Sequence, residues 1–280
     1  MGISVRFSRI VFGLLLGGLV IATGVVGRLE PVHARSHTDP APTPDGSTAA
    51  DSDVPVKLLL PDLITEEVGD LRLLYDPNTG SRLLRFSNTV ANIGLGPVEL
   101  RGRPASQVGR FRVLQRLYGS NGRVLAEPLV GEIIFHRGHE HWHLSSFASY
   151  EVWHATREAQ PTHPARVRDK ISYCLFDHRP GSETSPDPVY EDCTPELQGL
   201  SPGWTDTYAA HIADQWVDLS GLKDGVYVLR SVVNPRGVIR EETRQNNEFL
   251  LAFQLQGASI RRVPVHPDPW DHLAGHPQPR

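Results

Sequence analysis

The sequence predicts an all-β protein, an antiparallel β-sandwich with long irregular loops. Three observations favour this fold class. Between Val56 and Val263, no long stretch has the 3.6-residue repeat of apolar side chains that is typical of an amphipathic helix. Short segments there alternate with period two or are rich in β-branched residues, as strands are. The 25 glycines and 23 prolines of the 280-residue chain suit many strands joined by turns.

Strand-like runs and turn signals follow one another along this region. The clearest runs are 83–88, 111–114, 226–229 and 249–255. Turn residues such as Asn-Gly and Asp-Gly separate the runs at 76–80, 120–122 and 223–225. Two connections, 155–169 and 177–198, are long enough to carry function. We therefore expect one β-rich domain over residues 56–263, without a second domain.

The two ends of the chain are not expected to belong to this domain. Arg6 and Arg9 precede an uncharged run at 10–26, and a small-residue site follows at Ala34. This order is typical of a secretory signal peptide over residues 1–34, with an uncleaved anchor as the alternative. The linker 35–55 and the tail 264–280 are polar and proline-rich, so we expect both to be disordered. The protein is therefore expected to be secreted or extracytoplasmic, at the cell surface if the segment stays uncleaved.

Charge and cysteine content exclude several classes of protein. Lys and Arg number 28 against 32 Asp and Glu, a net charge of −4, which argues against a nucleic-acid-binding protein. Two cysteines are too few for a four-cysteine zinc site. In an exported protein the even count suggests one disulfide between Cys174 and Cys193, and two free thiols are the alternative.

The strongest local signal is a histidine cluster within the segment Phe135-His136-Arg137-Gly138-His139-Glu140-His141-Trp142-His143. Alternate side chains of a strand share one face, so His139, His141 and His143 are expected to point the same way. Three neutral imidazoles with open coordination positions suit Cu(II) or Zn(II), and the spacing does not choose between them. A run of surface histidines without metal is the less favoured interpretation.

Three further residues look ordinary when each is taken alone. Lys170, one of only three lysines, begins a strand-like run and could be a charged residue at a strand edge. Asp206 and Tyr208 follow a rigid loop rich in Gly, Ser and Pro at 199–203, where a turn-capping aspartate and a half-buried tyrosine are common. Only their combination with the histidines makes them candidates for a functional site.

Taken together, these segments resemble the catalytic domain of the lysyl oxidase family. The histidine segment is similar to the family's metal strand W-H-x-C-H-x-H-x-H. Lys170-Ile171-Ser172-Tyr173-Cys174 is similar to K-x-S-F-C. The segment 198–210 is similar to Q-G-L-S-P-G-x-x-D-T-Y-G-A, except that Ala209 stands in place of the last Gly. Gly138 stands where animal members have a cysteine, so a bridge between Cys174 and Cys193 would be a rearranged version of the family's pairing.

The resemblance implies roles for the candidate residues. His139, His141 and His143 would bind copper, and Lys170 and Tyr208 would be joined as the cofactor lysine tyrosylquinone. Asp206 would be the general base. The residues suit this chemistry, because copper with O2 can oxidise a tyrosine ring to which a lysine amine then adds.

The implied activity is a secreted copper-dependent amine oxidase. It would convert primary amines, including peptidyl lysine, to aldehydes with O2, releasing hydrogen peroxide and ammonia. No nucleic acid is expected as a partner, and a membrane only through an uncleaved N-terminal anchor. Two alternatives stay open: a non-enzymatic copper- or zinc-binding β-sandwich, and a cell-surface adhesion module, which would leave the three histidines unexplained.

Overall fold

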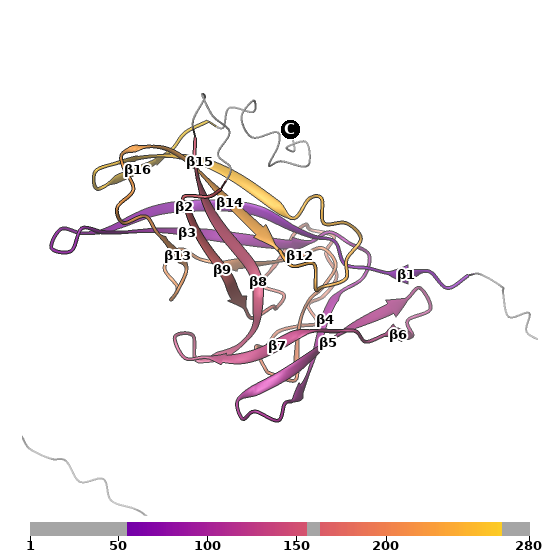
Figure 1. Ribbon diagram of the computed structural model, residues 1–280. Helices are drawn as coiled ribbons and strands as arrows, with labels where there is room; N and C mark the ends of the chain where they lie inside the picture. The colour runs from indigo at the N-terminus through magenta and orange to yellow at the C-terminus, as the bar shows by residue number, and fades with distance from the viewer. Residues whose placement is uncertain (1–54, 156–162, 265–280) are drawn as a thin grey trace, which may run out of the picture. The chain divides into compact units, whose positions relative to one another are not determined.

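The computed structural model describes residues 55–155 and 163–264 (Figure 1). The predicted signal peptide 1–34 lies outside these residues, as do the linker 35–55 and the tail 264–280 apart from Pro55 and Pro264. The described part contains strands and no helix, and all paired strands are antiparallel within two sheets, which confirms the all-β fold class. Within the same ranges, no helix is long and apolar enough to cross a membrane.

The larger sheet has eleven strands. Eight of them follow the order β11-β4-β5-β7-β8-β14-β15-β16, while β1 and β6 pair with β5, and β9 pairs with β8. Their bounds are β1 (Leu58–Leu59), β4 (Val98–Pro104), β5 (Arg110–Gly119), β6 (Val124–Ala126), β7 (Leu129–His136), β8 (His141–His154), β9 (Arg166–Tyr173), β11 (Leu197–Leu200), β14 (Gly225–Val233), β15 (Glu248–Gln256) and β16 (Ser259–Arg262).

The smaller sheet has five strands. Four follow the order β10-β12-β3-β13, and β2 pairs with β3. Their bounds are β2 (Leu63–Asp76), β3 (Ser81–Asn92), β10 (Arg179–Pro180), β12 (Trp204–Tyr208) and β13 (Trp216–Asp218).

The alternation in the sequence explains where the strands form. In β5, Val113, Gln115 and Leu117 are buried while the residues between them are partly exposed, as a strand with one face on a core requires. The predicted run 83–88 alternates in the same way within β3, whereas in the run 226–229 of β14 residues 227–229 are all buried, because both faces of β14 are covered. Each fully buried aliphatic or aromatic side chain contributes about 1.5–3 kcal/mol to folding.

The two sheets pack face to face around a shared core. The β2–β3 hairpin lies beside β14 and β15, as Figure 1 shows. Phe86 of β3 meets Tyr150 of β8 edge to face, with 4.7 Å between the ring centroids. Such aromatic contacts add to the burial of the rings themselves. The interior between the sheets therefore receives side chains from β3 and β12 on one side and from β8 and β9 on the other.

Strand β8 is long enough to serve two neighbours in succession. Its first residues pair with β7 and its last with β14, and the change occurs around Ser146, whose φ is +61°. A residue in the left-handed region lets the strand bend between the two partners. One strand thus carries both the histidine segment and the core residue Tyr150.

The long connection 177–198 is irregular as predicted, apart from β10 and the start of β11. The other long connection lies partly outside the described residues. A disulfide joins Cys174 to Cys193 with 5.5 Å between the Cα atoms, which confirms the predicted bridge. It ties the residue after β9 to the end of the irregular connection.

Candidate metal and amine oxidase site

The β7–β8 hairpin gathers four histidines. His136 ends β7 and pairs directly with His141, the first residue of β8. His139 lies in the turn, where its amide and that of Glu140 donate to the carbonyl oxygen of His136. The expected strand through 139–143 therefore begins only at His141, because the chain reverses at 137–140. His141 and His143 share a face as predicted, and the turn brings His139 onto the same side.

The four imidazole rings form one cluster. Ring nitrogens of His136, His139 and His143 lie within 4.8 Å of one another. The His141 ring lies 4.7 Å from the His143 ring and 5.5 Å from the His139 ring, between centroids. The structure thus brings the rings of the three predicted ligands together and adds His136, for which we predicted no ligand role. His136 was missed because it joins the cluster only by pairing with His141, and this pairing depends on the register of the hairpin.

Hydrogen bonds outside the cluster orient the imidazoles. His139 Nε2 lies 2.7 Å from the carbonyl oxygen of Ala213, and His143 Nδ1 lies 3.0 Å from Ser172 Oγ. His136 Nε2 lies 3.3 Å from an Asp214 carboxylate oxygen. Such partners fix which ring nitrogen is free to bind a metal. The other nitrogen of His136, Nδ1, is buried and has no hydrogen-bond partner among the residues that the structure describes, so it is available as a metal ligand.

Burial favours the neutral imidazoles that metal binding requires. Burial, with the neighbouring His139 as the next cause, lowers the pKa of His143 to about 2. The same causes, burial first, lower the pKa of His136 and of His141. At neutral pH these rings hold no proton that a metal would have to displace. The donor set therefore fits Cu(II) or Zn(II).

Tyr208 reaches this cluster from the opposite sheet. It ends β12, is 6% exposed, and places its hydroxyl oxygen 3.4 Å from His143 Nε2. The Cys174 amide donates to the same oxygen at 2.6 Å. Burial, together with Asp206, raises the pKa of Tyr208 well above its usual range. The predicted tyrosine therefore stands protonated beside the predicted metal ligands.

Asp206 lies two residues before Tyr208 on the same strand, so the two side chains share a face. Asp206 is 1% exposed, and neither carboxylate oxygen has a hydrogen-bond partner among the described residues. Burial raises the pKa of Asp206 well above its usual range, and the neighbouring Thr207 amide offsets only part of this effect. A buried carboxyl without partners is costly and is typical of functional sites.

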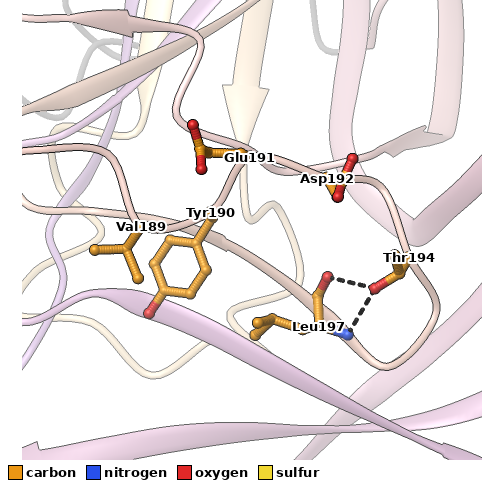
Figure 2. Close-up of a pocket in the computed structure, with 6 residues that line it drawn as sticks. All are labelled: Val189, Tyr190, Glu191, Asp192, Thr194 and Leu197. Carbon is orange, nitrogen blue, oxygen red and sulfur yellow. Dashed lines mark hydrogen bonds between the residues drawn. The ribbon is translucent and has the colours of Figure 1, made fainter.

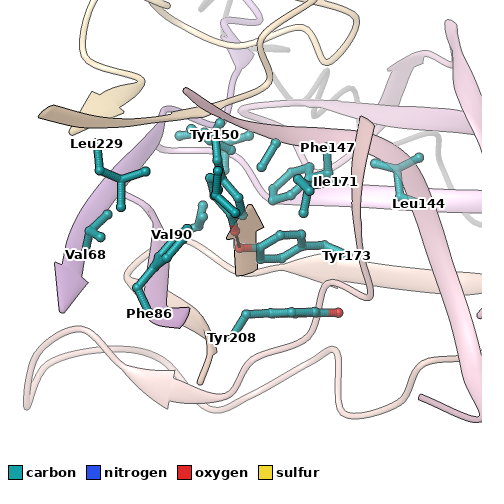
Figure 3. Packing of buried hydrophobic residues seen from close by; sticks show 14 of the residues in the cluster. Val68, Phe86, Val90, Leu144, Phe147, Tyr150, Ile171, Tyr173, Tyr208 and Leu229 are labelled. Carbon is teal, nitrogen blue, oxygen red and sulfur yellow. Dashed lines mark hydrogen bonds between the residues drawn. The ribbon is translucent and has the colours of Figure 1, made fainter. Parts of the chain in front are cut away.

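A buried pair of tyrosines packs against Tyr208. Tyr173 lies 3.8 Å from the Tyr208 ring between centroids, and its hydroxyl meets that of Tyr150 at 2.6 Å. Figure 3 shows Tyr208 beneath Tyr173, with the Tyr150 and Tyr173 hydroxyls pointing toward each other. Asn88 donates to the Tyr173 hydroxyl, and Gln215 contacts that of Tyr150. The sequence did not single out these residues, because their contact depends on the register in which β9 pairs with β8.

Lys170 lies in β9, opposite the second half of β8. The pairing there is irregular, because Ile171 pairs with Ala148 and Arg168 pairs with Tyr150. Between these two pairs, two residues of β9 lie opposite one residue of β8, which is a β-bulge. The side chain of Lys170 lies outside what the structure describes. The backbone therefore places the predicted lysine beside the strand that carries His141, His143 and Tyr150.

Comparison with known proteins gives a consistent result. The family model described as lysyl oxidase matches residues 120–263, just over half of the chain. The human and rat proteins named protein-lysine 6-oxidase are each 37% identical over 119 residues, which cover 40% of this chain and 26% of each relative. Human lysyl oxidase homolog 3 is 30% identical over 188 residues, 66% of this chain and 20% of that protein. The alignments thus span about a fifth to a quarter of these relatives, and on the family match the chain belongs to the lysyl oxidase family.

Proposed function

We propose that the protein is a copper-dependent amine oxidase whose quinone cofactor forms from Lys170 and Tyr208. The observation that carries this proposal is the position of Tyr208, whose hydroxyl lies 3.4 Å from His143 Nε2 while the partnerless carboxyl of Asp206 lies on the same face of β12. A buried tyrosine beside the proposed metal ligands, with a partnerless buried carboxyl on the same strand, is typical of a catalytic site rather than of a structural metal site.

The proposed metal ligands are His139, His141 and His143, with His136 in the same cluster. Copper bound there would supply, together with O2, the oxidation that makes a quinone of the tyrosine ring, and the quinone would be the electron acceptor for amine oxidation. Asp214, Ala213 and Ser172 keep the imidazole rings in place.

Side chains of the protein would accept the substrate proton and exclude water from the site. Asp206 would accept the proton from the carbon next to the substrate nitrogen, and burial strengthens the carboxylate as a base by raising its pKa. Tyr173 packs against the ring of Tyr208, Tyr150 lies behind Tyr173, and all three side chains are buried from water. This arrangement supports a proton transfer in a site shielded from solvent.

The proposed substrates are primary amines, among them the side-chain amine of lysine in a protein. The relatives named protein-lysine 6-oxidase support this class. We also propose that the protein acts outside the cytoplasm, and the Cys174–Cys193 disulfide supports an oxidising compartment.

Peptide mapping by mass spectrometry of protein matured with copper in air tests the proposal. The Lys170 and Tyr208 peptides should be covalently joined with the mass change of a quinone, and the protein should release hydrogen peroxide from a primary amine. Lys170→Arg and Tyr208→Phe should abolish both signals. Lys223→Arg and Tyr75→Phe are matched controls at exposed positions and should retain them. Separate, unmodified peptides in copper-loaded protein would refute the amine oxidase and leave a metal-binding β-sandwich.

A further inference from the structure

His141 belongs to a second group of possible ligands besides the histidine cluster. A ring nitrogen of His141 and the sulfur atoms of Cys174 and Cys193 all lie within 4.8 Å of one another. In the described structure the two sulfurs are joined as a disulfide. A disulfide sulfur carries no charge and is a poor ligand, so this group does not bind a metal ion while the disulfide is intact.

The backbone holds the three residues together independently of the S–S bond. Cys174 is fully buried, and its amide donates to the Tyr208 hydroxyl. Cys193 accepts a hydrogen bond from the Trp142 amide, next to His141 in β8. Gln198 Nε2 donates to the carbonyl oxygens of Trp142 and Thr194, which fastens the Cys193 segment to β8 a second time. Breaking the disulfide therefore leaves both cysteines anchored near His141.

Reduction changes what these atoms can bind. A thiol reductant supplies two electrons and two protons, the S–S bond breaks, and two thiols result. Each thiol releases its proton when it binds a metal as thiolate. Two thiolates and one imidazole form a soft ligand set that selects Zn(II) or Cu(I). Around a tetrahedral ion, ligand atoms stand roughly 3.5–3.8 Å apart, given metal–sulfur and metal–nitrogen bonds of about 2.3 and 2.0 Å. Atoms already within 4.8 Å need only small side-chain rotations to meet this geometry.

We propose that reduction of the Cys174–Cys193 disulfide creates a second metal site, formed by His141, Cys174 and Cys193, for Zn(II) or Cu(I). Occupation of this site turns His141 away from His139 and His143, so the two metal sites compete for one imidazole. The state of the disulfide therefore decides which site holds a metal ion. In the oxidised chain it is the histidine cluster, and in the reduced chain it is the thiolate site. This inference does not rest on the proposed amine oxidase activity.

The site has a route to solvent along the loop that carries Cys193. Cys193 is half-buried, and its neighbours Asp192 and Thr194 line a surface pocket of about 220 Å³. Figure 2 shows this loop, with Thr194 bonded to the backbone of Leu197 and with the exposed carboxylate side chains of Glu191 and Asp192. Carboxylates at such an entrance attract a hydrated cation. The reductant and the metal can therefore both approach Cys193 from this side.

Cobalt(II), used alone as a spectroscopic probe for zinc, tests the proposal on the full-length metal-free chain. The chain is reduced with a phosphine, freed of reductant without air, and titrated beside the oxidised chain. The reduced chain should develop the near-ultraviolet sulfur-to-cobalt charge-transfer band, and the oxidised chain should not. Cys193→Ser should lose the two-thiolate band. His141→Gln should weaken cobalt binding at this site at least about tenfold, because even outer partners of ligands are worth that much.

His136→Gln is the matched control, since it alters the histidine cluster without touching the cysteines, and its band in the reduced chain should equal that of the wild type. A reduced, folded chain without the band, or one whose cobalt affinity is unchanged by His141→Gln, would overturn the proposal. If reduction unfolds the chain, circular dichroism decides: refolding on addition of cobalt together with the band supports the site, and no refolding overturns it. Neither Lys170 nor Tyr208 takes part in this readout, so the outcome is separate from that of the amine oxidase test.

Discussion

Replacing Asp206 with asparagine should make the protein more stable and less active. The carboxyl is buried between the sheets, and neither oxygen has a partner among the described residues. A buried polar group without a partner costs about 1–3 kcal/mol, and a charged one more. Asparagine is also polar, so the substitution removes only the cost that is tied to ionisation of the carboxyl. We expect the free energy of unfolding at pH 7 to rise by about 1–3 kcal/mol, or Tm by roughly 3–9 °C for a domain of this size.

The pH dependence of this gain follows from the direction of the pKa shift. Burial raises the folded-state pKa of Asp206 above the ordinary value of 3.8. As the pH rises past that ordinary value, the unfolded chain loses its proton first, so this group lowers the free energy of unfolding progressively until the folded-state pKa is reached. Asparagine does not titrate. The difference in Tm between variant and wild type should therefore grow with pH above about 4 and vanish toward acid pH.

Asp177 offers a matched control, because it is also buried but fully paired. One of its oxygens accepts from Ser201 Oγ at 2.7 Å and from the Val189 amide at 2.8 Å, and the other accepts from the Ser201 amide at 2.8 Å. Asp177→Asn puts an NH2 group opposite a donor and should cost about 1.5–3 kcal/mol. Thermal unfolding followed by circular dichroism from pH 4 to 8 compares the two variants. An Asp206→Asn protein that is less stable than the wild type at pH 7, or equally stabilised at every pH, would refute the reasoning.

Amine oxidation by the Asp206→Asn variant should fall about 10²–10⁴-fold, the usual contribution of a general base. Cys193→Ser opens a disulfide loop of 19 residues and should lower the free energy of unfolding in urea by roughly 3 kcal/mol. Tyr173→Phe removes a buried hydroxyl with two partners and should cost about 1–3 kcal/mol in the same assay. Gly199→Ala would place a Cβ 2.5 Å from the Val98 carbonyl oxygen and should cost about 1–3 kcal/mol, whereas Gly225→Ala meets only an ordinary contact at 3.7 Å and should cost less. Unfolding midpoints that rank Gly225→Ala below Gly199→Ala would contradict the steric argument.

Local patterns in the sequence were enough to predict the strands and part of the candidate site. Period two places His141 beside His143 and Asp206 beside Tyr208, because each pair lies on one strand. The disulfide followed from an even cysteine count alone. These features depend on neighbours in the chain, which a single sequence displays directly.

The remaining features of the site depend on which strands pair and in what register. His136 enters the cluster only because it pairs with His141 across the hairpin. The Tyr150–Tyr173 contact requires β9 to lie beside β8. Asp214 reaches His136 from a connection far along the chain. Side-chain periodicity carries no information about such pairings, so these partners could not be named in advance.

The histidines and Tyr208 differ in how early during folding they reach their final positions. The four imidazoles belong to one short hairpin, whose closure takes on the order of microseconds. Tyr208 lies 65 residues beyond His143 and meets it only when the second sheet docks, a non-local step that takes milliseconds to seconds in β-sandwiches. The proposed metal binding by the hairpin would thus be kinetically separate from assembly of the tyrosine against it. We expect a folding intermediate trapped before the sheets dock to hold metal already, while its tyrosine is still exposed to water.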